Sequence, residues 1–179
     1  MSKNIVILSG SPRKGGTTDK LVSAFMEGAE PASKTVALFR VADLKIGGCL
    51  GCNHCFKETG VCVQKDDMLP IFDALRKADA VVFASPIYFF AVTAQLKLAI
   101  DRIYALLKEG TPAKRAALLL TCDAETNDVT ASAVTMFHMI SNYQKWDEAG
   151  IVTASGLHNT SDIDGRKELE EARQLGKEI

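Results

Sequence analysis

Residues 5–18 read IVILSGSPRKGGTT, an apolar run from Ile5 to Leu8 that passes directly into a loop of glycine and hydroxyl residues. The run is typical of a buried strand. Apolar positions then recur at helical spacing from Leu21 to Met26. A strand, a glycine-rich loop and a helix in this order predict the first unit of an α/β fold.

The rest of the 179-residue chain continues this alternation. Further apolar runs predict strands at 35–41, 80–84, 116–121 and 150–154. Helical spacing predicts helices at 18–30, 67–78, 94–107, 129–146 and 164–177. Because the strands are apolar on both faces, they predict a parallel sheet between two layers of helices. We expect a single three-layer domain over 1–179 with strand order 2-1-3-4-5, interrupted by a polar excursion at about 43–66.

Composition limits the classes of partner and location. The chain is 47% apolar and carries 21 basic against 22 acidic residues, so neither nucleic acid nor an anionic membrane is an expected partner. The first apolar run is too short for a secretion signal, and Pro86 interrupts the longest apolar stretch, 80–92. A cytoplasmic location is therefore expected, where the five cysteines form no structural disulfides.

The first loop has the composition of a phosphate-binding turn. Glycines let successive amides face one point, the following helix adds unpaired amides, and Arg13 adds a positive fork. Gly10 and Gly15 match the nucleotide-triphosphate motif, but Gly16 stands where its lysine belongs. The dinucleotide motif G-x-G-x-x-G is also missing. A terminal monophosphate such as that of FMN remains, rather than a connection without a chemical role. The expected contacts are Ser9, Ser11, Arg13, Gly16, Thr17 and Thr18.

Three aromatic residues follow the third strand, in the sequence SPIYFF at 85–90. The predicted strand order places this loop beside the phosphate loop, at the edge where such sheets bind FMN. Apolar and aromatic side chains there suit the wall of a flat ring. Packing in the core or at a subunit interface is the alternative, and it is favoured for Phe90. The residues expected around the ring are Pro86, Ile87, Tyr88, Phe89, Thr121 and Asp123. His158, which follows the fifth predicted strand, is a candidate to approach the flavin or a substrate.

The polar excursion contains four cysteines in the pattern C-x2-C-x2-C-x6-C. These residues are Cys49, Cys52, Cys55 and Cys62. Their compact spacing resembles the ligand run of bacterial 4Fe–4S sites. Zinc prefers two separated C-x2-C pairs, and a redox-active dithiol is a further alternative. A 4Fe–4S cluster is the favoured interpretation; zinc, a dithiol and a loop without any metal stay open.

Three phrases together resemble a known family: GSPRKGGTT at 10–18, CVQKDDM at 62–68, and SPIYFF followed by AQLKLAIDR at 94–102. They are similar to the NADPH-dependent FMN reductase group of flavodoxin-like proteins and, more narrowly, to the iron–sulfur flavoproteins. The resemblance covers nearly the whole chain. It implies FMN with its phosphate at 11–18 and its ring against 86–89. It also implies a homodimer or homotetramer in which a neighbouring subunit helps to cover the flavin. Thr17 replaces the asparagine of many relatives, and its hydroxyl can also meet phosphate.

The expected function is that of an FMN-dependent oxidoreductase. It would accept hydride from NAD(P)H and pass electrons to a small-molecule or protein acceptor. Because the cofactor carries the redox chemistry, no catalytic side chain is assigned. The alternative is an electron carrier in which a 4Fe–4S cluster and FMN exchange electrons with a ferredoxin-like partner, without nicotinamide. A third hypothesis is a zinc-stabilised or redox-sensing binding module.

Overall fold

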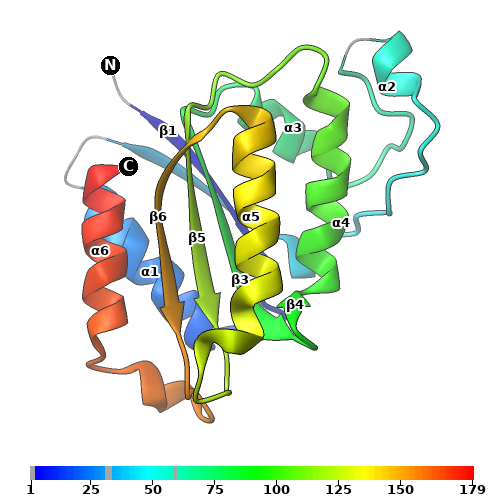
Figure 1. Cartoon of the computed structure of the whole chain (residues 1–179). Coiled ribbons are helices and arrows are strands. Elements are labelled where there is room, and N and C mark those ends of the chain that lie inside the picture. Colours follow the sequence, from blue (N-terminus) through cyan, green and yellow to red (C-terminus); the bar gives the residue numbers. More distant parts are fainter. Residues whose placement is uncertain (1–2, 31–33, 59) are drawn as a thin grey trace.

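The computed structural model describes residues 3–30, 34–58 and 60–179 and has a central sheet with helices on both faces (Figure 1). The strands are β1 (Asn4–Ser9), β2 (Thr35–Arg40), β3 (Ala80–Tyr88), β4 (Ala91–Val92), β5 (Arg115–Thr121) and β6 (Asp147–Ala154). The α-helices are α1 (Thr17–Ala29), α2 (His54–Lys57), α3 (Leu69–Leu75), α4 (Ala94–Ile103), α5 (Ala131–Gln144) and α6 (Lys167–Glu178). Short 3-10 helices are η2 (Val41–Asp43), η3 (Tyr104–Leu106), η4 (Asn127–Thr130) and η5 (Thr160–Ile163).

The long strands are all parallel and lie in the order β2-β1-β3-β5-β6. In predicted numbering this is 2-1-3-4-5, so the doubly wound α/β fold is confirmed. The prediction of five strands was one short. The sixth strand, β4, pairs antiparallel with the end of β3, with Ile87 opposite Val92. Two phenylalanines form the turn between them, and the glycine or asparagine that signals such a hairpin is missing.

The strands are apolar on both faces because a helical layer covers each face. In β1, Ile5 and Ile7 pack in the core under α1 and α6, while Val6 and Leu8 pack in the core under α3, α4 and α5. This alternation follows the two-residue period of a strand. The helix expected at 67–78 is shorter, since α3 begins at Leu69 with a proline in its first turn. The strand expected at 150–154 begins three residues earlier, at Asp147.

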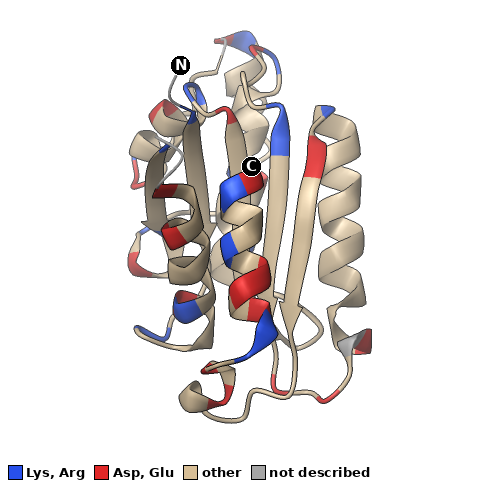
Figure 2. Cartoon of the chain, turned by 90° about the vertical axis from the view of Figure 1, so that its left-hand side faces the viewer, with Lys and Arg blue, Asp and Glu red and all other residues tan. Residues whose placement is uncertain are grey.

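The surface carries both signs of charge. Acidic and basic residues are interspersed along α6 (Figure 2), where Lys167 pairs with Glu171 at 3.1 Å. Arg173 of α6 pairs with Glu27 of α1 at 2.8 Å and so joins two helices of one layer. Among the helices described, none combines the length and the apolarity needed to cross a membrane.

Candidate functional site

The loop between β1 and α1 is fixed by its two different glycines. Gly15 has a φ of 68°, a backbone angle that side chains disfavour, and its amide donates to Asp19 Oδ2 at 2.8 Å. Gly10 instead makes a close approach, because a Cβ there would lie 2.4 Å from Thr93 Oγ1. That hydroxyl donates to the Gly10 carbonyl at 2.9 Å. The loop is therefore joined to the residue that precedes α4.

A pocket opens at the N-terminus of α1, at the carboxyl edge of the sheet. Its lining residues are Ser11, Arg13, Gly16, Thr17, Thr18, Pro86, Tyr88, Leu157, His158, Asn159 and Thr160. The first amides of a helix have no intrahelical partner, and the helix dipole is positive at this end. With the hydroxyls and the guanidinium of Arg13, these amides form a set of donors that suits a phosphate.

The structure brings most of the predicted flavin-binding residues into this pocket. Those on the lining are Ser11, Arg13, Gly16, Thr17, Thr18, Pro86 and Tyr88. Thr121 lies directly behind it, with its Oγ1 2.7 Å from that of Thr18. Ser9 is buried at the end of β1, and no described residue bonds its hydroxyl. The pocket thus lies where β1 and β3 end, with the end of β5 behind it.

Besides Ser9 and Thr121, three predicted residues lie outside the pocket lining. Ile87 packs against the core, and Asp123 is exposed after β5. Phe89 is 96% exposed at the tip of the β3–β4 hairpin. Both tip residues have left-handed backbone angles, with φ of 47° at Phe89 and 67° at Phe90, which are costly for aromatic residues. A hydrogen bond from Ser132 to the Phe90 carbonyl ties the tip to α5.

The segment after β6 supplies a wall of the pocket that sequence reasoning largely missed. Leu157, Asn159 and Thr160 line it together with His158, the one residue of the segment that the topology had suggested. His158 Nε2 lies 3.0 Å from Glu125 Oε1. The available signal was Gly156, which follows the last strand at the same sheet edge and has a φ of 68°.

An ion pair at the end of β2 stabilises the phosphate loop. Arg40, the last residue of β2, pairs with Asp19 of α1, and its Nη2 donates to the Ser11 carbonyl at 3.2 Å. Burial alone would lower the pKa of Arg40, but its bonds to Asp19 and Asp43 raise it overall. The guanidinium therefore stays charged and joins β2 to both ends of the loop.

The four cysteines of the excursion line one small pocket beside η3. Cys55 is buried, Cys62 is half-buried, and Cys49 and Cys52 are exposed; every cysteine of the chain is a free thiol. Burial raises the pKa of the Cys55 thiol, and the charges of the other three add to this effect. Over the residues described, no three His, Cys, Asp or Glu side chains are arranged to hold a metal ion. The four thiols therefore line one pocket but do not surround a common point as metal ligands would.

A buried arginine anchors this cysteine pocket to α4. Arg102 donates through Nη1 to Asp66 Oδ2 at 2.7 Å and through Nη2 to Oδ1 at 3.1 Å. Asp66 also accepts from the amides of Gly47 and Met68, at 2.9 and 3.2 Å. Burial alone would raise the pKa of Asp66, but these hydrogen bonds outweigh it and hold the pKa below its ordinary value. Both ends of the excursion are thus fixed to one helix.

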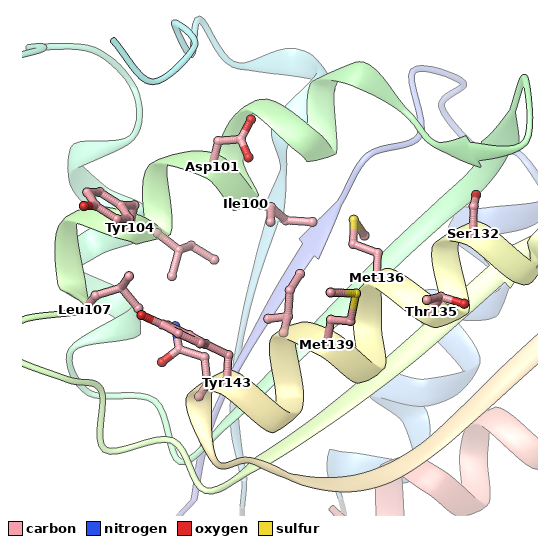
Figure 3. Close-up of a pocket in the computed structure, with 12 residues that line it drawn as sticks. Ile100, Asp101, Tyr104, Leu107, Ser132, Thr135, Met136, Met139 and Tyr143 are labelled. Carbon is pink, nitrogen blue, oxygen red and sulfur yellow. The ribbon is translucent and has the colours of Figure 1, made fainter. Parts of the chain in front are cut away.

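A larger cavity, of about 730 Å³, lies elsewhere, between α4 and α5. Figure 3 shows Ile100, Met139 and Tyr143 facing the space between the two helices. Asp101 is the only charged residue on its lining. Without cationic side chains, this groove does not suit a phosphate.

The model of the NADPH-dependent FMN reductase family matches residues 3–146, which include β1, α1 and the whole cysteine excursion. The chain belongs to this family. The match confirms FMN as the predicted cofactor. FMN carries a single phosphate, so the match also explains why the turn is rich in donors but lacks the lysine of nucleotide-triphosphate sites.

Individual relatives resemble this chain over about half of its length. An iron–sulfur flavoprotein of Archaeoglobus fulgidus is 40% identical over 94 residues, which are 52% of this chain and 42% of that protein. Another, from Methanocaldococcus jannaschii, is 37% identical over 98 residues, or 55% of this chain and 50% of that protein. The chain spans about half the length of the curated relatives it matches.

Solved structures extend the likeness in fold to the whole chain. An NAD(P)H:quinone oxidoreductase from Methanothermobacter marburgensis has a TM-score of 0.74 at 17% identity, covering 99% of this chain and 96% of that one. An azoreductase from Bacillus anthracis has a TM-score of 0.76 at 20% identity and covers 100% of both chains. These structures share the flavodoxin-like fold that the sequence predicted.

Proposed function

We propose that this chain is an FMN-dependent oxidoreductase that accepts hydride from NAD(P)H and passes electrons to a small-molecule or protein acceptor. The observation that carries the proposal is the pocket at the N-terminus of α1. Hydrogen-bond donors suited to a phosphate line it together with Pro86 and Tyr88, which are suited to pack against a flat ring. Bound FMN would supply the redox chemistry. Its phosphate belongs against Arg13 and the amides of Thr17 and Thr18, and its ring against the end of β3.

The chain's own part in this reaction is to position groups and to limit access to them. Thr18 is held by Thr121, and the phosphate loop is held by Arg40, so the donors are in place before the cofactor arrives. Such preorganisation reduces the entropy lost on binding. The segment 157–160 closes one side of the pocket. His158 is the titratable side chain on that side.

A second candidate, an electron carrier with a 4Fe–4S cluster beside FMN, is favoured by the gathered thiols and by the names of the relatives. Cys49, Cys52, Cys55 and Cys62 would hold the cluster, and a ferredoxin-like protein would be the partner. The cysteine pocket adjoins the C-terminal end of α4, whereas the flavin pocket adjoins its N-terminal end. A ten-residue helix separates them, about 15 Å. Zinc or a dithiol at the same thiols is the competing assignment.

A homodimer or homotetramer in the cytoplasm completes the proposal. Met139 and Tyr143 of α5 are 69% and 72% exposed and belong to the apolar groove of Figure 3. A second copy of the chain would cover this face. The free thiols agree with a reducing compartment. Light scattering should then give at least twice the monomer mass, and Met139→Asp should lower it.

The deciding experiment is an anaerobic absorbance spectrum with flavin, iron and sulfide quantified on one sample. The reductase proposal expects bound FMN whose absorbance is bleached by NADPH or NADH. Flavin that resists both nucleotides but is reduced by a ferredoxin, with stoichiometric iron and sulfide, would favour the carrier. Zinc without flavin would overturn both.

A further inference from the structure

One nitrogen of Arg102 is buried without a partner. The side chain is 1% exposed, and both Nη atoms are engaged, with Asp66 and with the Gly47 carbonyl, which accepts from Nη1 at 2.9 Å. Within the described part of the chain, no atom has the geometry of a hydrogen-bond acceptor for Nε. Burial alone would lower the pKa of Arg102, but its bonds to Asp66 and the neighbouring Cys62 thiol raise it overall. An unsatisfied buried donor gives up its hydrogen bonds to water without replacement, and the cost is larger when the group is charged. A group of this kind in a native protein therefore calls for an explanation.

Arg102 lines the same small pocket as the four cysteines of the excursion. The other polar side chains of that lining have partners of their own. Gln64 donates to the Gly48 carbonyl at 2.9 Å, and the Tyr104 hydroxyl donates to Asn53 Oδ1 at 3.2 Å. Arg102 is thus the one cation on the lining, and it is the side chain with a donor to spare.

The surroundings hold the guanidinium against the pocket. The Asp66 carboxylate accepts from both Nη atoms, and Cζ lies over the Phe72 ring, 5.9 Å from its centroid. This bidentate pairing fixes the plane of the guanidinium, which a lysine could not match. Hydrogen bonds to the sulfurs and local charge set the potential of an iron–sulfur cluster.

We propose that Arg102 is a positioning and tuning residue for the sulfur-bound group, with Nε–H donating to a cysteine sulfur of a 4Fe–4S cluster. The inference rests on the cluster assignment made under the proposed function. The buried positive charge compensates the net negative charge of four thiolates and their cluster. It therefore favours the reduced form, which carries one more electron. Its removal should make the cluster harder to reduce.

The test compares three variants of the full chain, Arg102→Gln, Arg102→Lys and Arg76→Gln, with the unchanged protein. Arg76 is the matched control, because it holds the other side of the same loop by donating to the Gly60 carbonyl at 3.0 Å but does not line the cysteine pocket. Each protein is reconstituted anaerobically with ferrous iron and sulfide. Iron, sulfide and FMN are quantified, and the cluster is titrated potentiometrically with detection by electron paramagnetic resonance.

We expect Arg102→Gln to keep FMN and to shift the cluster midpoint negative by at least 59 mV, a tenfold change in the one-electron equilibrium. The midpoint potential of Arg102→Lys should lie between those of Arg102→Gln and the unchanged protein, and Arg76→Gln should leave the midpoint unchanged. If Arg102→Gln holds too little cluster to titrate, a negative shift in Arg102→Lys supports the proposal.

Two results would overturn the inference alone. The first is an unchanged midpoint in a cluster-loaded Arg102→Gln protein. The second is loss of the cluster in both Arg102 variants with FMN retained, which would assign the arginine a structural role only. If the unchanged protein takes up FMN but no iron and sulfide, the cluster assignment itself fails and the inference falls with it.

Discussion

The phosphate loop and the cysteine loop are braced alike but prepared differently for a ligand. Each is held by an arginine–aspartate pair from neighbouring elements, Arg40 with Asp19 and Arg102 with Asp66. The donors of the phosphate loop include backbone amides that the start of α1 holds in place. The donors of the cysteine loop are side chains, and Cys49 and Cys52 still face solvent.

This difference reflects how each kind of site is built. A helix N-terminus presents its amides as soon as the helix forms, because they are part of the backbone. Thiolates repel one another and converge only when a metal neutralises them, so metal binding and ordering of the loop are coupled. The phosphate loop should therefore tolerate loss of one contact better than the cysteine loop does.

The largest contrast is expected from Cys55→Ser. Cys55 is the buried thiol of the cysteine loop, and its loss should abolish most of the iron and sulfide of the reconstituted protein while FMN stays bound. Cys122→Ser is the matched control, since Cys122 is buried after β5, with its Sγ 3.3 Å from Ser155 Oγ. Equal iron contents in the two variants would contradict a cluster at this loop.

Asp66→Asn tests the brace of the cysteine loop through stability. It leaves the buried Arg102 without its counter-charge, which should lower the free energy of unfolding by about 3 kcal/mol at neutral pH. Because the pKa of Asp66 is depressed in the folded protein, its contribution is present above the ordinary carboxyl pKa and lost as pH falls through the folded value. In urea unfolding, the difference in the free energy of unfolding between the variant and the unchanged protein should disappear below about pH 4.

The control for this brace is Asp73→Asn, which breaks an exposed pair with Arg76. Its effect should stay below about 1 kcal/mol at every pH. If the loss of unfolding free energy caused by Asp66→Asn did not vary with pH, that result would contradict the role given to the ionised carboxylate.

Arg13→Gln measures the contribution of a single charged donor to the phosphate loop. Loss of one charge-assisted hydrogen bond should raise the dissociation constant for FMN about tenfold. Lys14→Gln removes the same charge one residue away, from a side chain that is 77% exposed and lies outside the pocket lining. Fluorescence titration of FMN into the apoprotein compares them, and equal losses would mean that the effect is only one of overall charge.

Asp19→Asn should have the smallest effect. It removes the ion pair with Arg40 but keeps an oxygen for the Gly15 amide. We expect FMN binding to weaken by no more than about fivefold, in line with a partly exposed pair. Glu27→Gln, which breaks a pair at the other end of α1, should leave binding unchanged. A loss as large as that of Arg13→Gln would show that the brace, and not the backbone, determines the loop's shape.

Sequence reasoning succeeded where the signal is local. The strand, the glycine-rich loop and the helix of residues 5–18 are contiguous, so their order predicts both the fold and the phosphate pocket. It failed at the Phe89–Phe90 turn, because the pairing of β3 with β4 imposes backbone angles that these residues disfavour. It also missed most of the wall at 157–160, which only the closure of the sheet by β6 brings to the first loop.

By itself, the sequence determined the order of the strands, the phosphate loop and the presence of four clustered thiols. Alternating apolar runs and glycine positions are properties of short segments, and they act before the chain is compact. Only the tertiary structure decided which charges meet. Arg102 and Asp66 are 36 residues apart, and Arg40 and Asp19 are 21 apart. Whether such residues touch depends on how helices and strands pack, and no local pattern encodes that contact.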